Sequence, residues 1–151
     1  MKLSPLQLES YFTTEVTFRA NPEFATGQPS KFGANDLDVT AECARLPNTS
    51  DRWQVTLHLK FQPPPTANSP YYFALQLVGV LWAAPMLPPD KVEALVRTNG
   101  PSLLFGVARE LVRELSARGP FSPLMLPSLS FLPGNAESVP ANSQAAEAAA
   151  K

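Results

Sequence analysis

The chain has 151 residues, of which 44% are hydrophobic and 17% are charged, enough apolar material for the core of one globular domain. Its 17 prolines, more than twice the usual share of about 5%, exclude a bundle of long helices, because proline removes a backbone donor and blocks helix interiors. With 12 basic and 13 acidic residues the net charge is −1, which does not favour nucleic acid or an anionic membrane as a partner.

The single cysteine, Cys43, excludes an internal disulfide and a metal site built from several cysteines, and is typical of a reducing compartment. The N-terminus has no uninterrupted apolar stretch of signal-peptide length, and no segment elsewhere approaches the roughly 20 apolar residues of a membrane-spanning helix. We therefore expect a cytoplasmic protein.

Four segments predict β-strands. In the first, Phe12, Val16 and Phe18 are placed on one side of a half-buried strand. The third segment, Arg52–Phe61, shows strict alternation of apolar and polar residues. The fourth, Tyr71–Trp82, is apolar almost throughout, as in a strand covered on both faces. Because turns without helices join them, they predict one antiparallel sheet. The strands are expected over Leu6–Ala20, Leu37–Arg45, Arg52–Phe61 and Tyr71–Trp82.

An irregular loop, Asn21–Asn35, is expected to carry Phe24 and Phe32 between the first two strands. After the sheet the sequence predicts two helices, one from Asp90 to about Val96 and a longer one that begins at Ser102. The Asn-Gly-Pro sequence at 99–101 is expected to separate them.

The segment Pro120–Pro133 is apolar and punctuated by proline, so it is expected to be extended and packed. The last 17 residues contain seven alanines and no aromatic residue, and they cannot bury enough surface to fold. The expected organisation is an α+β domain over residues 1–134, with two helices on one face of a four-stranded antiparallel sheet, and a disordered tail over residues 135–151.

The residues of this sequence give little support for a catalytic function. The only histidine, His58, is on the polar side of its strand, and Cys43 is on an apolar side, so the two are expected on opposite faces of the sheet. Asp36 and Asp38 are more typical of solvated acids at a strand edge than of a catalytic pair. No metalloprotease, phosphate-loop or serine-hydrolase motif occurs. We predict no enzyme activity, cofactor or metal.

The sequence carries more apolar surface than so small a domain needs. Phe24 and Phe32 stand in a loop, and the segment Tyr71–Trp82 is apolar on both faces. Burial under the two helices and the segment Pro120–Pro133 accounts for part of this surface. The remainder has to be covered by another subunit or by a bound apolar ligand.

In the segment Gly100–Phe131 a proline-led helix containing Phe and Ala-Arg-Glu is followed by Ser-x-Arg-Gly-x-Phe and then by Leu-x-Leu-Pro-x-x-x-Phe. This segment closely resembles the C-terminal hallmark of SecB-type protein-export chaperones. The first strand and the Gly79-Val80 pair also resemble the family. The residues that carry the resemblance are Pro101, Phe105, Ala108-Arg109-Glu110, Ser116, Arg118-Gly119, Phe121, Leu124, Leu126, Pro127 and Phe131.

The resemblance implies a bacterial holdase chaperone that needs no ATP, assembled as a homotetramer (a dimer of dimers), which binds unfolded preproteins in apolar grooves. Aromatic and aliphatic walls bind apolar segments without sequence-specific contacts, at roughly 25 cal/mol per Å² buried. The peptide-binding residues implied by the resemblance are Phe24, Phe32, Trp53, Tyr71, Phe73, Leu75 and Leu77.

The resemblance also implies docking on the translocase motor SecA through an acidic patch on the outer face of the sheet. The corresponding residues are Glu15, Arg19, Tyr72 and Ala74. Only Glu15 keeps an acid there, because Arg19 and Ala74 stand where the family pattern has carboxylates. The leading hypothesis is an export chaperone of the SecB type. The alternative is a SecB-like chaperone dedicated to one partner, such as an antitoxin, that does not dock on SecA.

Overall fold

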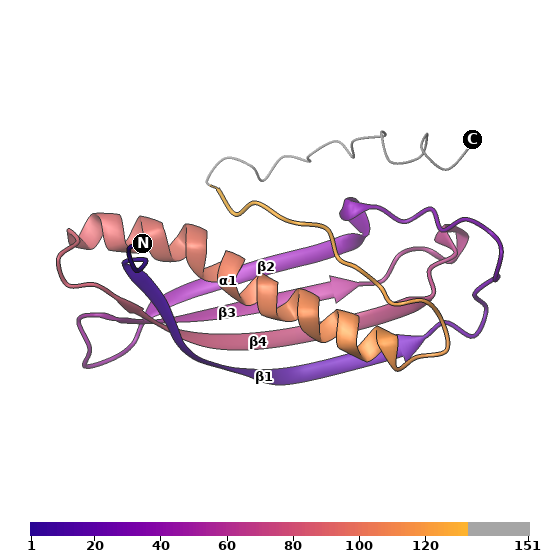
Figure 1. Ribbon diagram of the computed structural model, residues 1–151, viewed down its shortest axis with the longest axis horizontal. Coiled ribbons are helices and arrows are strands. Elements are labelled where there is room, and N and C mark those ends of the chain that lie inside the picture. The colour runs from indigo at the N-terminus through magenta and orange to yellow at the C-terminus, as the bar shows by residue number, and fades with distance from the viewer. Residues whose placement is uncertain (133–151) are drawn as a thin grey trace.

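The four predicted strands pair into one antiparallel sheet in the order β1-β4-β3-β2. The strands are β1 (Leu6–Ala20), β2 (Leu37–Arg45), β3 (Arg52–Phe61) and β4 (Tyr71–Ala83), and the 3-10 turns η1 (Ala34–Asp36) and η2 (Pro65–Ala67) precede β2 and β4. The computed structural model describes residues 1–132, and its one α-helix, α1 (Pro89–Ala117), crosses one face of the sheet diagonally (Figure 1). The α+β class and the four-stranded antiparallel sheet are thus confirmed.

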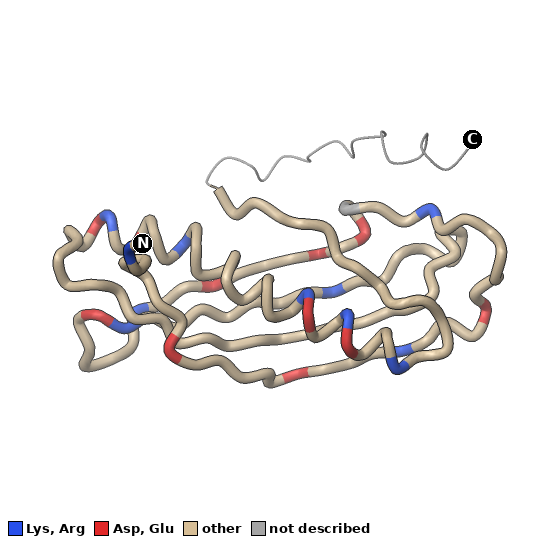
Figure 2. The backbone as a smooth tube through the Cα atoms, viewed as in Figure 1, with Lys and Arg blue, Asp and Glu red and all other residues tan. Residues whose placement is uncertain are grey.

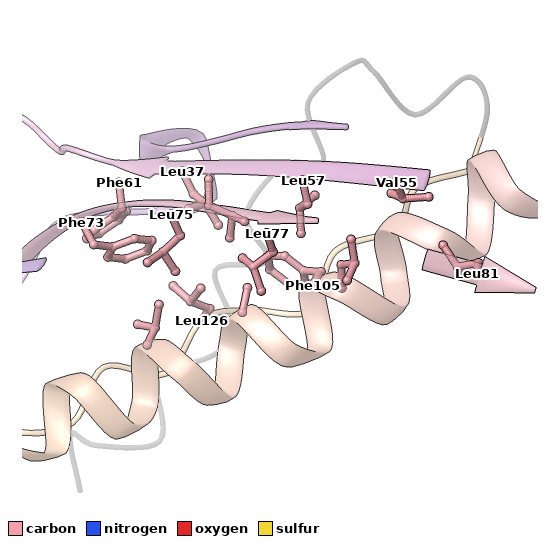
Figure 3. Close-up of a cluster of buried hydrophobic side chains, with 14 of the residues drawn as sticks. Leu37, Val55, Leu57, Phe61, Phe73, Leu75, Leu77, Leu81, Phe105 and Leu126 are labelled. Atoms are coloured by element: carbon pink, nitrogen blue, oxygen red, sulfur yellow. The ribbon is translucent and has the colours of Figure 1, made fainter. Parts of the chain in front are cut away.

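The strict alternation of apolar and polar residues along β3 gives the sheet one apolar face and one polar face. Every apolar residue from Trp53 to Phe61 is at most 4% exposed and lies on the side of α1, which we call the core face. On β4 the core face carries Tyr71, Phe73, Leu75 and Leu77, and Figure 3 shows the last three directed toward the helix. The opposite side, the outer face, carries the polar residues of β3 and has no helix among the described residues.

The prediction that Phe12 shares a side with Val16 and Phe18 is wrong. The register of β1 against β4 shifts between Thr13 and Glu15, so that Phe12 pairs with Val78 on the outer face whereas Val16 and Phe18 pair with core-face residues. A bulge inserts one residue, and one residue reverses every later side chain because the strand period is two. Phe12 is accordingly 53% exposed.

The prediction of two helices is also wrong, since α1 runs without interruption through the expected break at Asn99-Gly100-Pro101. Proline inside a helix costs about 3 kcal/mol, and here packing across the break offsets that cost. Val96, Pro101 and Leu104 are all buried on one stripe that faces the sheet. Gly100 permits the approach, because a Cβ at this position would lie 2.9 Å from Cγ2 of Val55. Ser102, where the second helix was expected to begin, lies inside α1 and donates its hydroxyl proton to the carbonyl of Thr98.

The end of α1 is joined to β4 by the hydroxyl of Tyr71. This hydroxyl accepts a hydrogen bond from the backbone N–H of Phe121 (2.9 Å). It shares its own proton between two acceptors, the carbonyl of Phe121 at 2.8 Å and the carbonyl of Ser116 at 3.1 Å. Gly119 leaves room for the ring, because a Cβ there would lie 2.6 Å from the Tyr71 oxygen. The glycine is therefore required by close packing.

Replacing Tyr71 by phenylalanine is expected to lower the free energy of unfolding by about 1–3 kcal/mol, because the N–H and carbonyl of Phe121 lose a partner in a part-buried site. The matched control is Tyr72→Phe on the outer face, since the Tyr72 hydroxyl makes no hydrogen bond within residues 1–132. Urea unfolding of both variants measures the difference. Equal midpoints for the two variants would contradict the role given to the Tyr71 hydroxyl.

The segment from Pro120 to Leu132 is extended and packed, as predicted from its apolar residues, with Leu124 and Leu126 at most 6% exposed in the core. Pro133, the predicted domain boundary at residue 134 and the predicted tail over residues 135–151 lie outside the described residues. Within the described part of the chain, α1 is too polar to span a membrane.

Candidate functional site

Seven aromatic side chains form a continuous network at one end of the sheet, which we call the aromatic network. Neighbouring ring centroids are 4.8–6.4 Å apart, within the range at which aromatic pairs attract. The path starts and ends in the loop between β1 and β2 and passes through three strands and the segment after α1. In order, its members are Phe24, Phe121, Tyr71, Phe18, Phe73, Phe61 and Phe32.

The network has a buried interior and an accessible rim. Tyr71, Phe73 and Phe61 are at most 3% exposed. The other four rings, including Phe24 and Phe32 of the loop, are only half-buried. An apolar chain arriving from solvent therefore meets aromatic rings that are already held in place, and ordering them costs little additional entropy.

Asn68 holds the loop that carries Phe24 and Phe32. Its side-chain oxygen accepts the N–H of Ala25 at 2.9 Å, and its amide nitrogen donates to the carbonyls of Ala25 and Gln28, each at 3.2 Å. The backbone of Asn68 is left-handed, with φ 49°, a conformation that asparagine tolerates better than most residues. A single side chain between η2 and β4 thus fixes the course of the aromatic loop.

The segment 120–132 closes the core face beside α1. Its attachment combines the two buried leucines with a few hydrogen bonds: the N–H of Leu124 donates to Oγ of Ser116 at 2.9 Å, and Nε of Arg109 donates to the carbonyl of Leu126 at 3.1 Å. Figure 3 places Leu126 in the layer between the sheet and the helix. The chain therefore supplies its own extended apolar segment to the surface on which the strand residues lie.

Six of the seven expected peptide-binding residues form two adjoining groups on the core face. Phe24, Phe32, Tyr71 and Phe73 meet in the aromatic network, and Leu75 and Leu77 continue along the core face of β4 beneath α1. Trp53 lies apart from them. It stands eight residues from Phe61 along β3, about 26 Å at the rise of a strand, where the guanidinium of Arg45 lies 5.1 Å from its ring.

The four residues expected to dock SecA do meet on the outer face. Arg19 pairs with Tyr72, and the neighbouring pairs bring Glu15 and Ala74 to the same end of β1 and β4. Charges of both signs are spread along the rest of the chain, with red and blue positions close together on α1 (Figure 2). These include the ion pairs Glu93–Arg97 and Glu110–Arg113.

Cys43 and His58 lie on opposite faces, as predicted. Cys43 is opposite Val55 on the core face, whereas His58 is opposite Gln76 on the outer face. Burial raises the pKa of the Cys43 thiol, and nearby Arg97 opposes that shift. A raised thiol pKa reduces the thiolate fraction, which suits a packed side chain better than a nucleophile. Within residues 1–132 no cluster of three potential metal ligands occurs.

Sequence reasoning missed three members of the aromatic network and its anchor. Phe18 and Phe61 occupied apolar positions of predicted strands, and Phe121 belonged to the quoted motif, so their aromatic type was a usable signal. Asn68 gave no such signal, because its partners are about 40 residues away in the chain.

Comparison with known proteins identifies the family and the fold. A family model described as preprotein translocase subunit SecB matches residues 3–133. The chain belongs to the SecB family. The resemblance seen in the segment Gly100–Phe131 is thereby confirmed, and so is the function expected at the level of the family, a SecB-type chaperone of protein export.

Two curated SecB relatives match most of the chain. The protein-export protein SecB of Rhodopseudomonas palustris is 31% identical over 131 residues, which cover 84% of this chain and 78% of the relative. That of Rhodospirillum centenum is 27% identical over 134 residues, covering 85% and 76%. The similarity therefore extends well beyond the C-terminal motif.

Among solved structures, the SecB-like chaperone Rv1957 of Mycobacterium tuberculosis, in complex with a ChAD peptide from the HigA1 antitoxin, has a TM-score of 0.59. It is 16% identical in sequence, and the match covers 83% of this chain and 88% of the Rv1957 chain. This likeness supports the SecB fold.

Proposed function

We propose that this protein is an ATP-independent holdase that binds unfolded preproteins in the bacterial cytoplasm and keeps them competent for export. The observation that carries the proposal is the aromatic network, whose rim of half-buried rings continues into the apolar core face of β4. Together with membership of the SecB family, this surface favours non-directional binding of apolar polypeptide segments.

The first binding contacts are assigned to Phe24 and Phe32, because both rings are half-buried at the rim and both belong to the loop fixed by Asn68. The deeper positions, Tyr71, Phe73, Leu75 and Leu77, are almost fully covered by α1 and the segment 120–132. A client reaches them when the segment 120–132 moves aside. Trp53 is a secondary contact for a long client that extends to the other end of the sheet.

The double variant Phe24→Ala/Phe32→Ala is expected to raise the Kd for an unfolded client at least tenfold, which corresponds to about 1.4 kcal/mol. Suppression of aggregation of a chemically denatured client, measured without ATP by light scattering, gives the activity. The matched control is Phe12→Ala, an exposed phenylalanine on the outer face. No protection by the unaltered chain, or equal protection by all variants, would contradict the proposal.

A second copy of the chain is proposed to cover the groove between β1 and α1. This groove has a volume of about 500 Å³ beside the edge strand, and its apolar lining includes Tyr11 and Leu103, which are 53% and 41% exposed. An unpaired strand edge next to exposed apolar side chains is a surface that natural proteins usually cover. The proposed assembly is a homotetramer built as a dimer of dimers.

Light scattering is expected to give a mass that is a multiple of the 16.4 kDa chain. Leu103→Glu should reduce that mass, because the glutamate would lose its hydration at the interface. A monomeric mass for the unaltered protein would rule out the assembly.

The second candidate function is a chaperone dedicated to one partner, such as an antitoxin. It is favoured by Arg19 and Ala74, which stand on the outer face where an acidic docking patch for SecA is implied. Affinity purification of the tagged chain from its host distinguishes the two functions. One stoichiometric partner favours the dedicated chaperone, whereas many unrelated clients together with SecA favour export.

A further inference from the structure

A hollow of about 290 Å³ opens on the outer face of the sheet, away from α1, and its lining includes Phe61 and Phe73 of the aromatic network. Its floor is Ala74 of β4, which pairs with Thr17 of β1 on one side and with Lys60 of β3 on the other. Because the methyl group of Ala74 is shorter than the side chains around it, a depression remains above this residue. Tyr72, opposite Arg19, forms the wall at the end of the strand.

The hollow has an excess of positive charge. Arg19 and Lys60 both line it and are both exposed, and neither forms an ion pair within residues 1–132. By contrast, Arg52, Arg97 and Arg113 each pair with a carboxylate. The nearest acids by register do not line the hollow. Glu15 lies opposite Gln76, and Asp38 lies opposite Lys60 in the register of β2 and β3, on the side of Lys60 away from Ala74.

The spacing of the two cations suits an extended polypeptide. Arg19 and Lys60 are separated by two strand spacings and by two residues along the strands, about 12 Å between Cα atoms in an ideal sheet. Carboxylates two to four positions apart on one side of an extended chain span about 7–13 Å. The long side chains of Arg19 and Lys60 cover the difference, and the peptide backbone between the two acids crosses above Ala74.

We propose that this hollow binds an acidic, extended segment of a partner protein, whose carboxylates pair with Arg19 and Lys60. Nucleic acid is a poorer fit, because its binding surfaces are large and strongly basic, whereas this chain has a net charge of −1 and two cations at the site. Phe61 and Phe73 also line the hollow, but their side chains lie on the core face. Variants of Arg19, Lys60 and Ala74 therefore leave the client contacts of the proposed function in place, and the two proposals can be tested separately.

The test uses a fluorescein-labelled peptide in which glutamates alternate with leucine, and a peptide with glutamine in place of glutamate. At low salt the full-length protein is expected to bind the glutamate peptide at least tenfold more tightly by fluorescence anisotropy. Arg19→Glu/Lys60→Glu should abolish that preference. Ala74→Leu, which fills the hollow without changing charge, should weaken binding severalfold.

The matched control is Lys2→Glu/Lys91→Glu, which changes the net charge by the same −4 at exposed positions away from the hollow. It should keep the preference for the glutamate peptide. Equal loss in both double variants would mean that only bulk charge is sensed and would overturn the proposal. So would equally tight binding of a single-stranded oligonucleotide of the same charge. Aggregation suppression, assayed on the same variants, should remain unchanged.

Discussion

Replacing Leu124 and Leu126 together by aspartate is expected to detach the segment 120–132 from the core face. Both side chains are at most 6% exposed, and burying an unpaired carboxylate costs far more than the segment's hydrogen bonds recover. The lost burial of two leucines alone corresponds to about 3 kcal/mol or more. The sheet and α1 retain their own contacts, so the change is expected to be local.

Hydrogen exchange should show the detachment as a loss of protection at residues 120–132, and binding of an apolar dye should rise. The affinity for an unfolded client should also rise severalfold, because the client no longer competes with the chain's own segment for the core face. Met125→Asp is the matched control, since Met125 lies between the two leucines and is 64% exposed. A detached segment with unchanged or weaker client binding would show that the segment is a wall of the groove instead of a competitor.

Leu104→Ala is expected to lower the free energy of unfolding by about 2–5 kcal/mol, the usual range for such a cavity in a packed core. Leu104 is fully buried at the centre of α1, and its Cδ2 lies 2.8 Å from the position that a Cβ on Gly79 would take. The two residues are complementary, so the cavity cannot be refilled by a neighbour on β4.

The matched control for Leu104→Ala is Leu132→Ala, the same substitution at a residue that is 56% exposed. Its effect should stay within about 0.5 kcal/mol. Denaturant unfolding at several protein concentrations separates this effect from any change in assembly. A loss below about 1 kcal/mol for Leu104→Ala would mean that α1 contributes less to the core than its burial indicates.

The strands were predictable because period-two alternation and turn residues are local signals. The first three match the structure at both ends, and β4 is one residue longer than predicted. The bulge that turns Phe12 outward was not predictable, since the extra residue leaves no mark except an apolar side chain on what became the outer face. Its cause is the pairing with β4, which lies far away in the chain.

The prediction of a break between two helices was wrong for a similar reason. Proline and glycine at 100–101 locally favour an interruption, but the side chains on both sides of Pro101 share one buried stripe. Tertiary packing outweighs local preference when both halves can bury their apolar residues in the same place. The site was partly predictable: aromatic residues identified Phe24, Phe32, Tyr71 and Phe73, whereas the Asn68 contacts depend on the fold.

The strand order also determines when the sheet can close as the chain is synthesised. β2, β3 and β4 are neighbours in both sequence and space, so they can pair once residue 83 has left the ribosome. β1 is made first but pairs only with β4, from which it is separated by residues 21–70. Closing so long a loop is slow compared with forming a hairpin. During synthesis the nascent chain therefore presents an unpaired strand carrying Tyr11, Phe12 and Phe18, and for that interval resembles the clients that its family binds.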